Sequence, residues 1–309
     1  MVFGFRSLLR SRRRNLIESR GGIHLPGSLR SPSSILVASG TGESDVWAAL
    51  FLCDSLQRHY GPGVLHVMCR KEDESLFSLL EWSPELVCAY GTDRRGAPEG
   101  QGVNDLRGLR PDMLFFPYDE MSDAMAGVLL EIRPTVLSSL AANEAVNLRV
   151  RLDQQVPLPE RIHRFCRILG ISPHPGWKPR CSRQDAGMAS ELLAPVSGRA
   201  LPYIVASEGA AALLREAGEE VPLKLVQLSG KGSLGAEAVP RSVRAAVVQE
   251  ASAVATDDAS LWAEACFFGA RVVGLDPSGS FQTWRSAIPC QDRASFFEGW
   301  ERLIREGWE

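Results

Sequence analysis

The polar residues best suited to take part in a reaction begin at the end of an apolar stretch, residues 35–39, which is expected to form a β-strand. Ser39, Thr41 and Gly42 belong to the following loop, and Asp45 opens a long apolar helix. A carboxylate in this position can act as a general base that takes a proton from a hydroxyl group. The alternative is a structural role, because unpaired backbone N–H groups and the helix dipole stabilise an aspartate at a helix start. The loop carries neither a Gly-Lys-Ser/Thr phosphate signature nor Gly-x-Gly-x-x-Gly.

Polar groups follow two apolar stretches in the second half of the chain in the same way. Asp258 and Ser260 follow one expected strand, and Ser207 and Glu208 follow another. A carboxylate holds sugar hydroxyls well, a serine hydroxyl can bond a phosphate, and a glutamate can reach a ribose. Each of these residues is equally suited to cap the helix that follows it. The sequence therefore leaves a donor-binding role and a capping role open.

Lys231 lies in a glycine-rich stretch, Gly-Lys-Gly-Ser-Leu, after a further expected strand. Such a flexible cation could neutralise a diphosphate, and the alternative is an ordinary turn before a helix. The seven cysteines and five histidines show no metal-ligand spacing, and the aspartates near residue 258 lack enough neighbouring oxygen ligands. We therefore expect neither a metal nor a cofactor.

Length and composition narrow the class of protein. The 309 residues are enough for two α/β domains, and the 45% hydrophobic and 23% charged shares are those of a soluble globular protein. A net charge of -3 gives no case for nucleic-acid binding. Scattered cysteines in odd number fit a reducing cytosol, and no apolar run approaches the roughly 20 residues of a membrane span. We expect a cytoplasmic protein.

A local excess of positive charge marks residues 5–20, which contain six arginines and one glutamate. One interpretation is a basic amphipathic arm that rests on an anionic membrane surface, so that the protein is peripheral on the inner membrane face. The alternative is a solvated terminus without a fixed partner.

The elements that must position these residues alternate along the chain. Strands are expected at 35–39, 64–69, 86–90, 113–117, 135–139, 203–206, 223–228, 253–256 and 272–275. Helices are expected at 45–60, 74–82, 122–132, 157–171, 182–193, 210–217, 243–250, 260–268 and 296–306, with a polar loop at 91–103. This order predicts an α/β fold with parallel sheets covered by helices. Three prolines in 172–179 interrupt the pattern and favour a domain boundary. The predicted organisation is a basic arm and linker at 1–33, a first domain at 34–175 and a second at 176–309, whose terminal helix could pack back on the first.

Several of these stretches together resemble glycosyltransferase family 9, the heptosyltransferases of lipopolysaccharide core assembly. The opening Ile-Leu-Val strand, its polar loop and Ser44-Asp45 are similar to the start of that family. Residues 56–62, 164–171, 230–234 and 258–275 resemble its later motifs in the same order, so the similarity runs from about residue 34 to the C-terminus.

This resemblance implies a GT-B fold, in which two Rossmann-like domains with parallel sheets face a central cleft. The first domain would bind a saccharide or lipid-linked acceptor, with Ser39, Thr41 and Gly42 in the acceptor-side loop. The second would bind a nucleotide-sugar donor such as ADP-heptose. Transfer would be inverting and independent of a metal. By position, Asp45 would be the base, Asp258 would hold the donor sugar, and Ser207 and Glu208 would lie near the diphosphate and nucleoside.

The chain departs from the family pattern where phosphate would bind. The family's basic residue in the first loop falls at Ser39, its Thr/Ser-Gly at Ala259-Ser260, its histidine at Ala263 and its lysine near Ala212. Losing one group that stabilises developing charge typically costs about 10²–10³ in rate. Two functions therefore stay open: a divergent glycosyltransferase, or a non-catalytic GT-B-fold binding or scaffold protein that has lost the donor site. A nucleotide-sugar epimerase of similar shape would carry a motif that is absent here.

Overall fold

The computed structural model of the protein describes residues 29, 31–42, 45–93, 98–153, 156, 158–174, 177, 179–197, 203–216, 224–228, 233–234, 237–238, 240–279, 281 and 287–305. The arm at residues 5–20 and Lys231 lie outside the described residues. The chain divides into two compact units. Unit 1 consists of residues 1–74 and 82–177, and unit 2 of residues 75–81 and 178–309.

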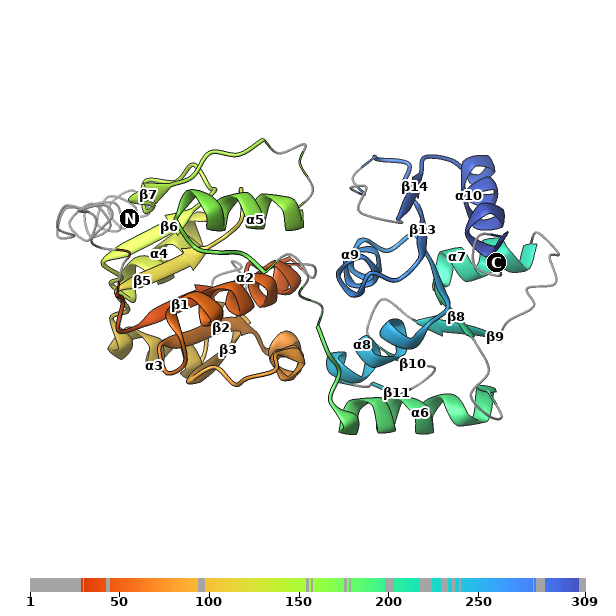
Figure 1. Ribbon diagram of the computed structural model, residues 1–309, viewed down its shortest axis with the longest axis horizontal. Coiled ribbons are helices and arrows are strands. Elements are labelled where there is room, and N and C mark those ends of the chain that lie inside the picture. The colour runs from red at the N-terminus through yellow and green to blue at the C-terminus, as the bar shows by residue number, and fades with distance from the viewer. Residues whose placement is uncertain are drawn as a thin grey trace, which may run out of the picture. The chain divides into compact units, whose positions relative to one another are not determined.

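Unit 1 is built on a sheet whose described strands follow the order β4-β3-β2-β1-β5-β6-β7 (Figure 1). Its strands are β1 (Ile35–Ala38), β2 (Leu65–Arg70), β3 (Leu86–Thr92), β4 (Pro98–Glu99), β5 (Met113–Phe116), β6 (Val136–Ser139) and β7 (Leu148–Arg149). Strand β1 pairs in parallel with both β2 and β5. Every residue of β1 and β5 is buried, as expected for central strands of a parallel sheet covered on both faces.

Helices of unit 1 follow these strands in βα order. They are α2 (Asp45–Tyr60), the 3₁₀ helix η2 (Lys71–Leu79), α3 (Gln101–Leu109), α4 (Asp123–Glu131) and α5 (Leu158–Ile168). Residues 75–79 at the end of η2 belong to unit 2. Helix α2 buries eleven consecutive residues from Val46 to Leu56, so it is a core helix rather than a surface helix. The packing of these buried residues therefore fixes the position at which the helix starts.

Unit 2 repeats this layout with the strand order β11-β10-β9-β8-β12-β13-β14. Its strands are β8 (Tyr203–Ser207), β9 (Lys224–Leu228), β10 (Ser233–Leu234), β11 (Glu237–Ala238), β12 (Ala253–Thr256), β13 (Val272–Leu275) and β14 (Ile288–Cys290). Strand β8 pairs in parallel with β9 and β12. The antiparallel strands β10 and β11 extend the sheet on the β9 side.

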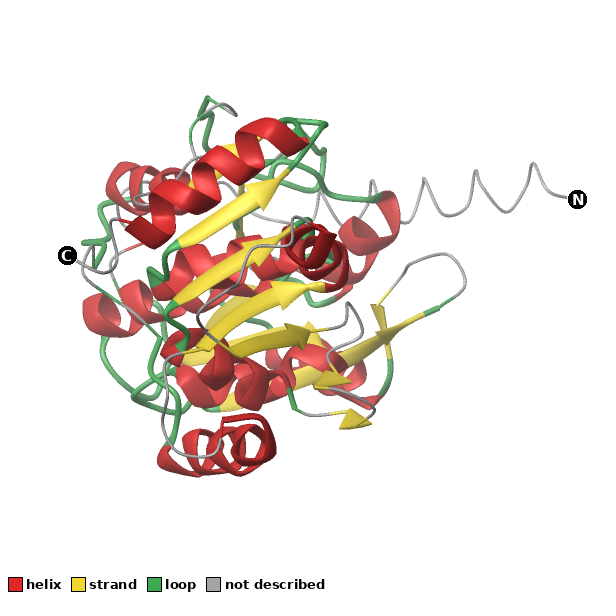
Figure 2. Cartoon of the chain, turned by 90° about the vertical axis from the view of Figure 1, so that its right-hand side faces the viewer, coloured by secondary structure: helices red, strands yellow, loops and turns green. Residues whose placement is uncertain are grey.

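Helices also accompany the strands of unit 2, and Figure 2 shows strands of the chain lying side by side between helices. The helices are α6 (Arg183–Ser197), α7 (Glu208–Glu216), α8 (Arg241–Glu250), α9 (Ala259–Phe268) and α10 (Arg293–Arg305). Helix α10 packs on this sheet through Phe296, Trp300 and Leu303, which belong to the same buried cluster as Ile204 and Val273.

The predicted α/β fold with parallel sheets is confirmed, with local differences. The helix expected at 74–82 is the 3₁₀ helix η2, which starts earlier, directly after β2. The segment expected to be a loop at 91–103 contains β4 and the start of α3. Short strands such as β7 and β14 carry too few alternating apolar residues to be recognised in the sequence. No helix among the described residues is long and apolar enough to cross a membrane.

Candidate functional site

The strand order of each sheet reverses direction at one point. In unit 1 the chain moves outward from β1 through β2 and β3, and then from β5 through β6 and β7, so the reversal lies between β1 and β5. In unit 2 it lies between β8 and β12. Open α/β sheets bind their ligands beyond the carboxyl ends of the strands at such a switch point. We call the edge where the parallel strands end the carboxyl edge of each sheet.

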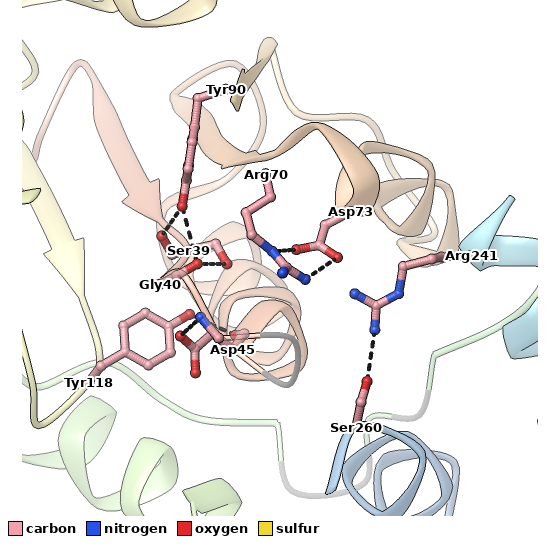
Figure 3. Close-up of polar contacts among 10 residues, drawn as sticks. Ser39, Gly40, Asp45, Arg70, Asp73, Tyr90, Tyr118, Arg241 and Ser260 are labelled. Atoms are coloured by element: carbon pink, nitrogen blue, oxygen red, sulfur yellow. Dashed lines mark hydrogen bonds and ion pairs between the residues drawn. The ribbon is translucent and has the colours of Figure 1, made fainter. Parts of the chain in front are cut away.

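Asp45 lies at the switch point of unit 1, where α2 begins (Figure 3). Its Oδ2 accepts a hydrogen bond of 2.8 Å from the backbone N–H of Gly42. Burial raises the pKa of the Asp45 carboxyl to about 6, while the Gly42 hydrogen bond and the charge of Arg70 act to lower it and Asp73 to raise it. A carboxyl that loses its proton near pH 6 is well matched to general-base work at neutral pH.

Two glycines make room for this carboxylate. A Cβ atom added at Gly40 would overlap the Asp45 carboxyl group, and one added at Gly42 would lie 3.0 Å from its Oδ2. Ser39 is fully buried, whereas Thr41 and Gly42 are exposed. The loop therefore folds closely over the Asp45 side chain, and Thr41 and Gly42 are the members of the predicted acceptor-side loop that solvent can reach.

Arg70 brings a positive charge to the same region from the carboxyl end of β2 (Figure 3). Its Nε and Nη2 donate to the two carboxylate oxygens of Asp73, over 2.8 and 3.1 Å. Asp73 is fully buried and the Arg70 side chain is 15% exposed. This bidentate geometry fixes the plane of the guanidinium group. Sequence reasoning missed the pair, although Arg70 follows directly on an expected strand.

Two buried tyrosines tie the loop after β1 to its neighbours. The Tyr118 hydroxyl donates to the backbone oxygen of Asp45 at 2.7 Å, and so connects the segment after β5 with the start of α2. The Tyr90 hydroxyl, from β3, lies 3.3 Å from the backbone oxygen of Ser39 and 3.2 Å from that of Gly40. Burial raises the pKa of both hydroxyls, so they stay protonated donors at neutral pH. The loop after β1 is therefore held by Tyr90 and the start of α2 by Tyr118.

Unit 2 repeats the relationship at its own switch point. The hydroxyl of Ser207, at the end of β8, donates to Oδ1 of Asp257, which follows β12. The backbone N–H of Asp257 donates back to the Ser207 hydroxyl over 3.0 Å. A Cβ atom added at Gly209 would overlap the Asp257 carboxyl group. Asp257 is exposed, so its carboxylate is available to a ligand hydroxyl.

Asp258 serves a different purpose from Asp257. Its Oδ1 accepts a 2.8 Å hydrogen bond from the backbone N–H of Leu261 and caps α9. The Ser260 hydroxyl, 5% exposed as a residue, accepts a 3.3 Å hydrogen bond from Nη2 of Arg241, the first residue of α8 (Figure 3). The capping interpretation of Asp258 is thus present in the structure, and Ser260 has a cationic partner.

A second arginine of α8, Arg244, contacts α9 about one helical turn further along than Arg241 does. Arg244 Nε lies 3.2 Å from Oε2 of Glu264 on α9, and the two residues are 5% and 1% exposed. Burial raises the pKa of the Glu264 carboxyl, against the charges of Arg244 and Arg241. The sequence analysis missed Arg241 because the expected helix began after it, at residue 243. It missed Arg244, which lies inside that expected helix, because its partner Glu264 belongs to another helix.

The remaining predicted residues are placed as follows. Glu208 is exposed at the start of α7. Arg271, a further cation of unit 2 directly before β13, donates to the backbone oxygen of Leu303, away from the carboxyl edge. No group of three or more His, Cys, Asp or Glu side chains suited to a metal ion occurs within the described ranges.

Comparisons with known proteins bear on this fold. No protein-family model and no curated protein sequence matches the chain. Among solved structures, the chain is similar to the Escherichia coli ADP-heptose lipopolysaccharide heptosyltransferase II, with a TM-score of 0.65 and 16% identity over 89% of this chain and 100% of that one. It is similar to the family 9 glycosyltransferase of Veillonella parvula, with a TM-score of 0.65 and 12% identity over 88% and 90% of the two chains.

A third similar structure is the Escherichia coli heptosyltransferase WaaC with ADP, with a TM-score of 0.62 and 14% identity over 89% of this chain and 99% of that one. Identities this low establish a shared fold. The resemblance to family 9 stated from the sequence is thus matched by structural neighbours from that family over nearly the whole chain. The fold is mixed α/β with parallel sheets, as in GT-B glycosyltransferases.

Proposed function

We propose that the protein is a glycosyltransferase that moves a sugar from a nucleotide-sugar donor to a saccharide or lipid-linked acceptor, with inversion at the anomeric carbon and without a metal. The observation that carries the proposal is Asp45, a partly buried carboxyl with a pKa of about 6 at the switch point of unit 1. The fold, which heptosyltransferases share, supports this choice of reaction.

In the proposed step, Asp45 takes the proton of an acceptor hydroxyl while the oxygen of that hydroxyl attacks the anomeric carbon of the donor sugar. The bond from that carbon to the donor phosphate breaks, and its electron pair leaves on the nucleoside diphosphate. Unit 1 would bind the acceptor and unit 2 the donor. Ser207, Glu208, Ser260 and Asp258 are the predicted donor contacts, together with Lys231, which lies outside the described residues.

The structure adds Asp257 to those candidates. Asp258 already caps α9, whereas Asp257 is exposed and held by Ser207 between the ends of β8 and β12. A carboxylate whose position is fixed by a neighbouring loop can accept hydrogen bonds from sugar hydroxyls without a further ordering cost. We therefore propose Asp257 as the carboxylate that contacts the donor sugar.

Calorimetry with ADP-heptose, ADP, UDP-sugars and GDP-sugars tests donor binding first. Saturable binding of one donor class, weakened by Asp257→Ala, is expected. With that donor and a panel of saccharide and lipid-linked acceptors, Asp45→Asn should abolish transfer while the Kd for donor stays unchanged, because Asp45 belongs to the acceptor side. The value of kcat/KM should rise about tenfold per pH unit below pH 6 and level off above it.

A non-catalytic binding or scaffold protein with a GT-B fold is the second candidate. The observation in its favour is that Asp258 is engaged as a helix cap, so its presence needs no donor to explain it. Folded protein that binds none of these nucleotides or nucleotide sugars would exclude the transferase and leave this candidate.

A further inference from the structure

Two helices of unit 2 place a guanidinium group and a hydroxyl group together. Strand β12 runs parallel to β8. Helix α8 precedes β12 and α9 follows it, so both helices begin at the carboxyl edge. Arg241, the first residue of α8, donates through Nη2 to the Ser260 hydroxyl on the first turn of α9 over 3.3 Å. The start of α9 also carries the positive end of the helix dipole. The two features add positive potential at one point.

We propose that Arg241 is the cation that neutralises the diphosphate of the nucleotide-sugar donor, an inference that rests on the proposed function. A leaving diphosphate develops negative charge as the sugar departs. Groups already aimed at that charge lower the barrier most. A guanidinium group can also bind two phosphate oxygens at once.

The buried pair behind Arg241 supports this assignment. Arg244 is 5% exposed and lies 3.2 Å from Glu264, so its charge is matched inside the protein. Among the described residues, neither oxygen of Glu264 has a hydrogen-bond partner, although the carboxyl is 1% exposed. The guanidinium of Arg244 supplies the positive charge that a buried carboxylate needs. Arg244 is therefore engaged with Glu264, whereas Arg241 bonds Ser260.

The Ser260 hydroxyl holds the Arg241 guanidinium at the start of α9 by a hydrogen bond. Arg241 is only partly buried, unlike Arg244, so a ligand can reach it. Arg271 cannot fill this role, because it is bonded to Leu303 at the amino end of β13. Arg241 is thus the arginine of α8 that a ligand can reach, whereas Arg244 is paired inside the protein.

The test compares nucleoside diphosphates with their nucleosides. Calorimetry on the full chain would measure binding of ADP, UDP and GDP, and of adenosine, uridine and guanosine, to the wild type and to Arg241→Met. We expect the preferred diphosphate to bind roughly 10- to 100-fold more weakly to the variant, the loss for a charge-assisted hydrogen bond. Affinity for the matching nucleoside should stay unchanged, which a general loss of structure would not allow.

Arg215→Met is the matched control, because Arg215 is an exposed arginine at the end of α7 that bonds Gln227. It should bind the diphosphate as the wild type does. Arg241→Gln keeps a donor for Ser260 and replaces the methionine variant if that one does not fold. Arg241→Lys keeps the charge without the planar fork and should bind with intermediate affinity.

Two outcomes separate the inference from the function on which it rests. If the wild type binds a nucleoside diphosphate and the Arg241→Met or Arg241→Gln protein binds it equally tightly, Arg241 is not the diphosphate ligand, while the transferase proposal stands. If the folded wild type binds no nucleoside diphosphate at all, both proposals are overturned together.

Discussion

The carboxylate of Asp45 occupies the space that a side chain on Gly40 would need. The same relationship joins Asp257 and Gly209 in unit 2. In both units the glycine follows the first, central strand of the sheet, and the aspartate lies at the switch point. Each carboxylate is therefore packed directly against backbone, which restricts where it can move. Close backbone approach of this kind is a reason for glycine that the sequence alone does not reveal.

Gly40→Ala should destabilise the protein by about 1–3 kcal/mol, because the new methyl group must displace the Asp45 carboxyl group. Urea unfolding would measure this loss. Asp45→Ala in the same chain should recover most of it, since Asp45 Cβ would then be the nearest remaining atom of that residue, 3.2 Å from the new Cβ. Gly127→Ala is the control, because nothing lies within 4 Å of an added Cβ inside helix α4. That change should raise stability by about 0.5–1 kcal/mol.

Asp45→Asn should stabilise the protein at neutral pH and not at low pH. Burial raises the pKa of the Asp45 carboxyl from 3.8 to about 6, so the folded state holds this proton more tightly than the unfolded chain does. The wild type therefore loses stability as pH rises through this interval, and the asparagine variant does not. The shift corresponds to at most about 3 kcal/mol.

Urea unfolding of both proteins between pH 4.5 and pH 8 would measure this difference. Asparagine keeps an oxygen for the Gly42 N–H, so the hydrogen bond is matched. Asp123→Asn is the control, an exposed aspartate in the first turn of α4. A stability difference between Asp45→Asn and wild type that is constant over the whole pH range would contradict the desolvation of Asp45.

The sequence was sufficient to predict the α/β fold and the place of Asp45, because buried strands followed by helices leave a periodic apolar pattern. It could not show the surroundings of Asp45 and its loop, since Arg70, Tyr90 and Tyr118 come from three other strands that only the strand order brings together. The helix expected at 74–82 became the 3₁₀ helix η2, which begins directly after β2. Tertiary position overrides local preference there.

The choice between Asp257 and Asp258 also lay beyond the sequence. Both residues precede the same helix, and either could have been its cap. In the structure Asp258 bonds the Leu261 N–H, while Asp257 bonds Ser207 across the switch point. Which of two adjacent carboxylates caps the helix depends on the backbone angles of the loop, for which residue type gives no signal.

Alanine and asparagine at position 258 separate its two candidate roles. Asp258→Ala should cost about 0.5–2 kcal/mol of stability through loss of the α9 cap, and Asp258→Asn should cost little, because asparagine caps equally well. Thermal unfolding would measure both. If Asp258 only caps the helix, the asparagine variant should also keep the wild-type Kd for the donor. A large rise in that Kd with stability intact would show that the Asp258 carboxylate itself contacts the donor.

Arg244→Met should destabilise unit 2 strongly. It leaves the buried Glu264 carboxyl without the guanidinium group 3.2 Å away, and breaking a buried ion pair in this way costs about 3–5 kcal/mol. The loss should grow as pH rises, because the pKa of Glu264, already raised by burial, would rise further once Arg244 is gone. A folded state that holds this proton more tightly loses stability with increasing pH.

Arg244→Met combined with Glu264→Leu should restore much of that stability, since the pair is then replaced by apolar groups instead of being broken. Urea unfolding of the two single variants and the double variant at pH 6 and pH 8 would give the coupling between the residues. Additive losses in this cycle would show that Arg244 and Glu264 do not depend on each other. Strong coupling would show that Arg244 is committed to the core, which leaves Arg241 as the arginine of α8 that can face a ligand.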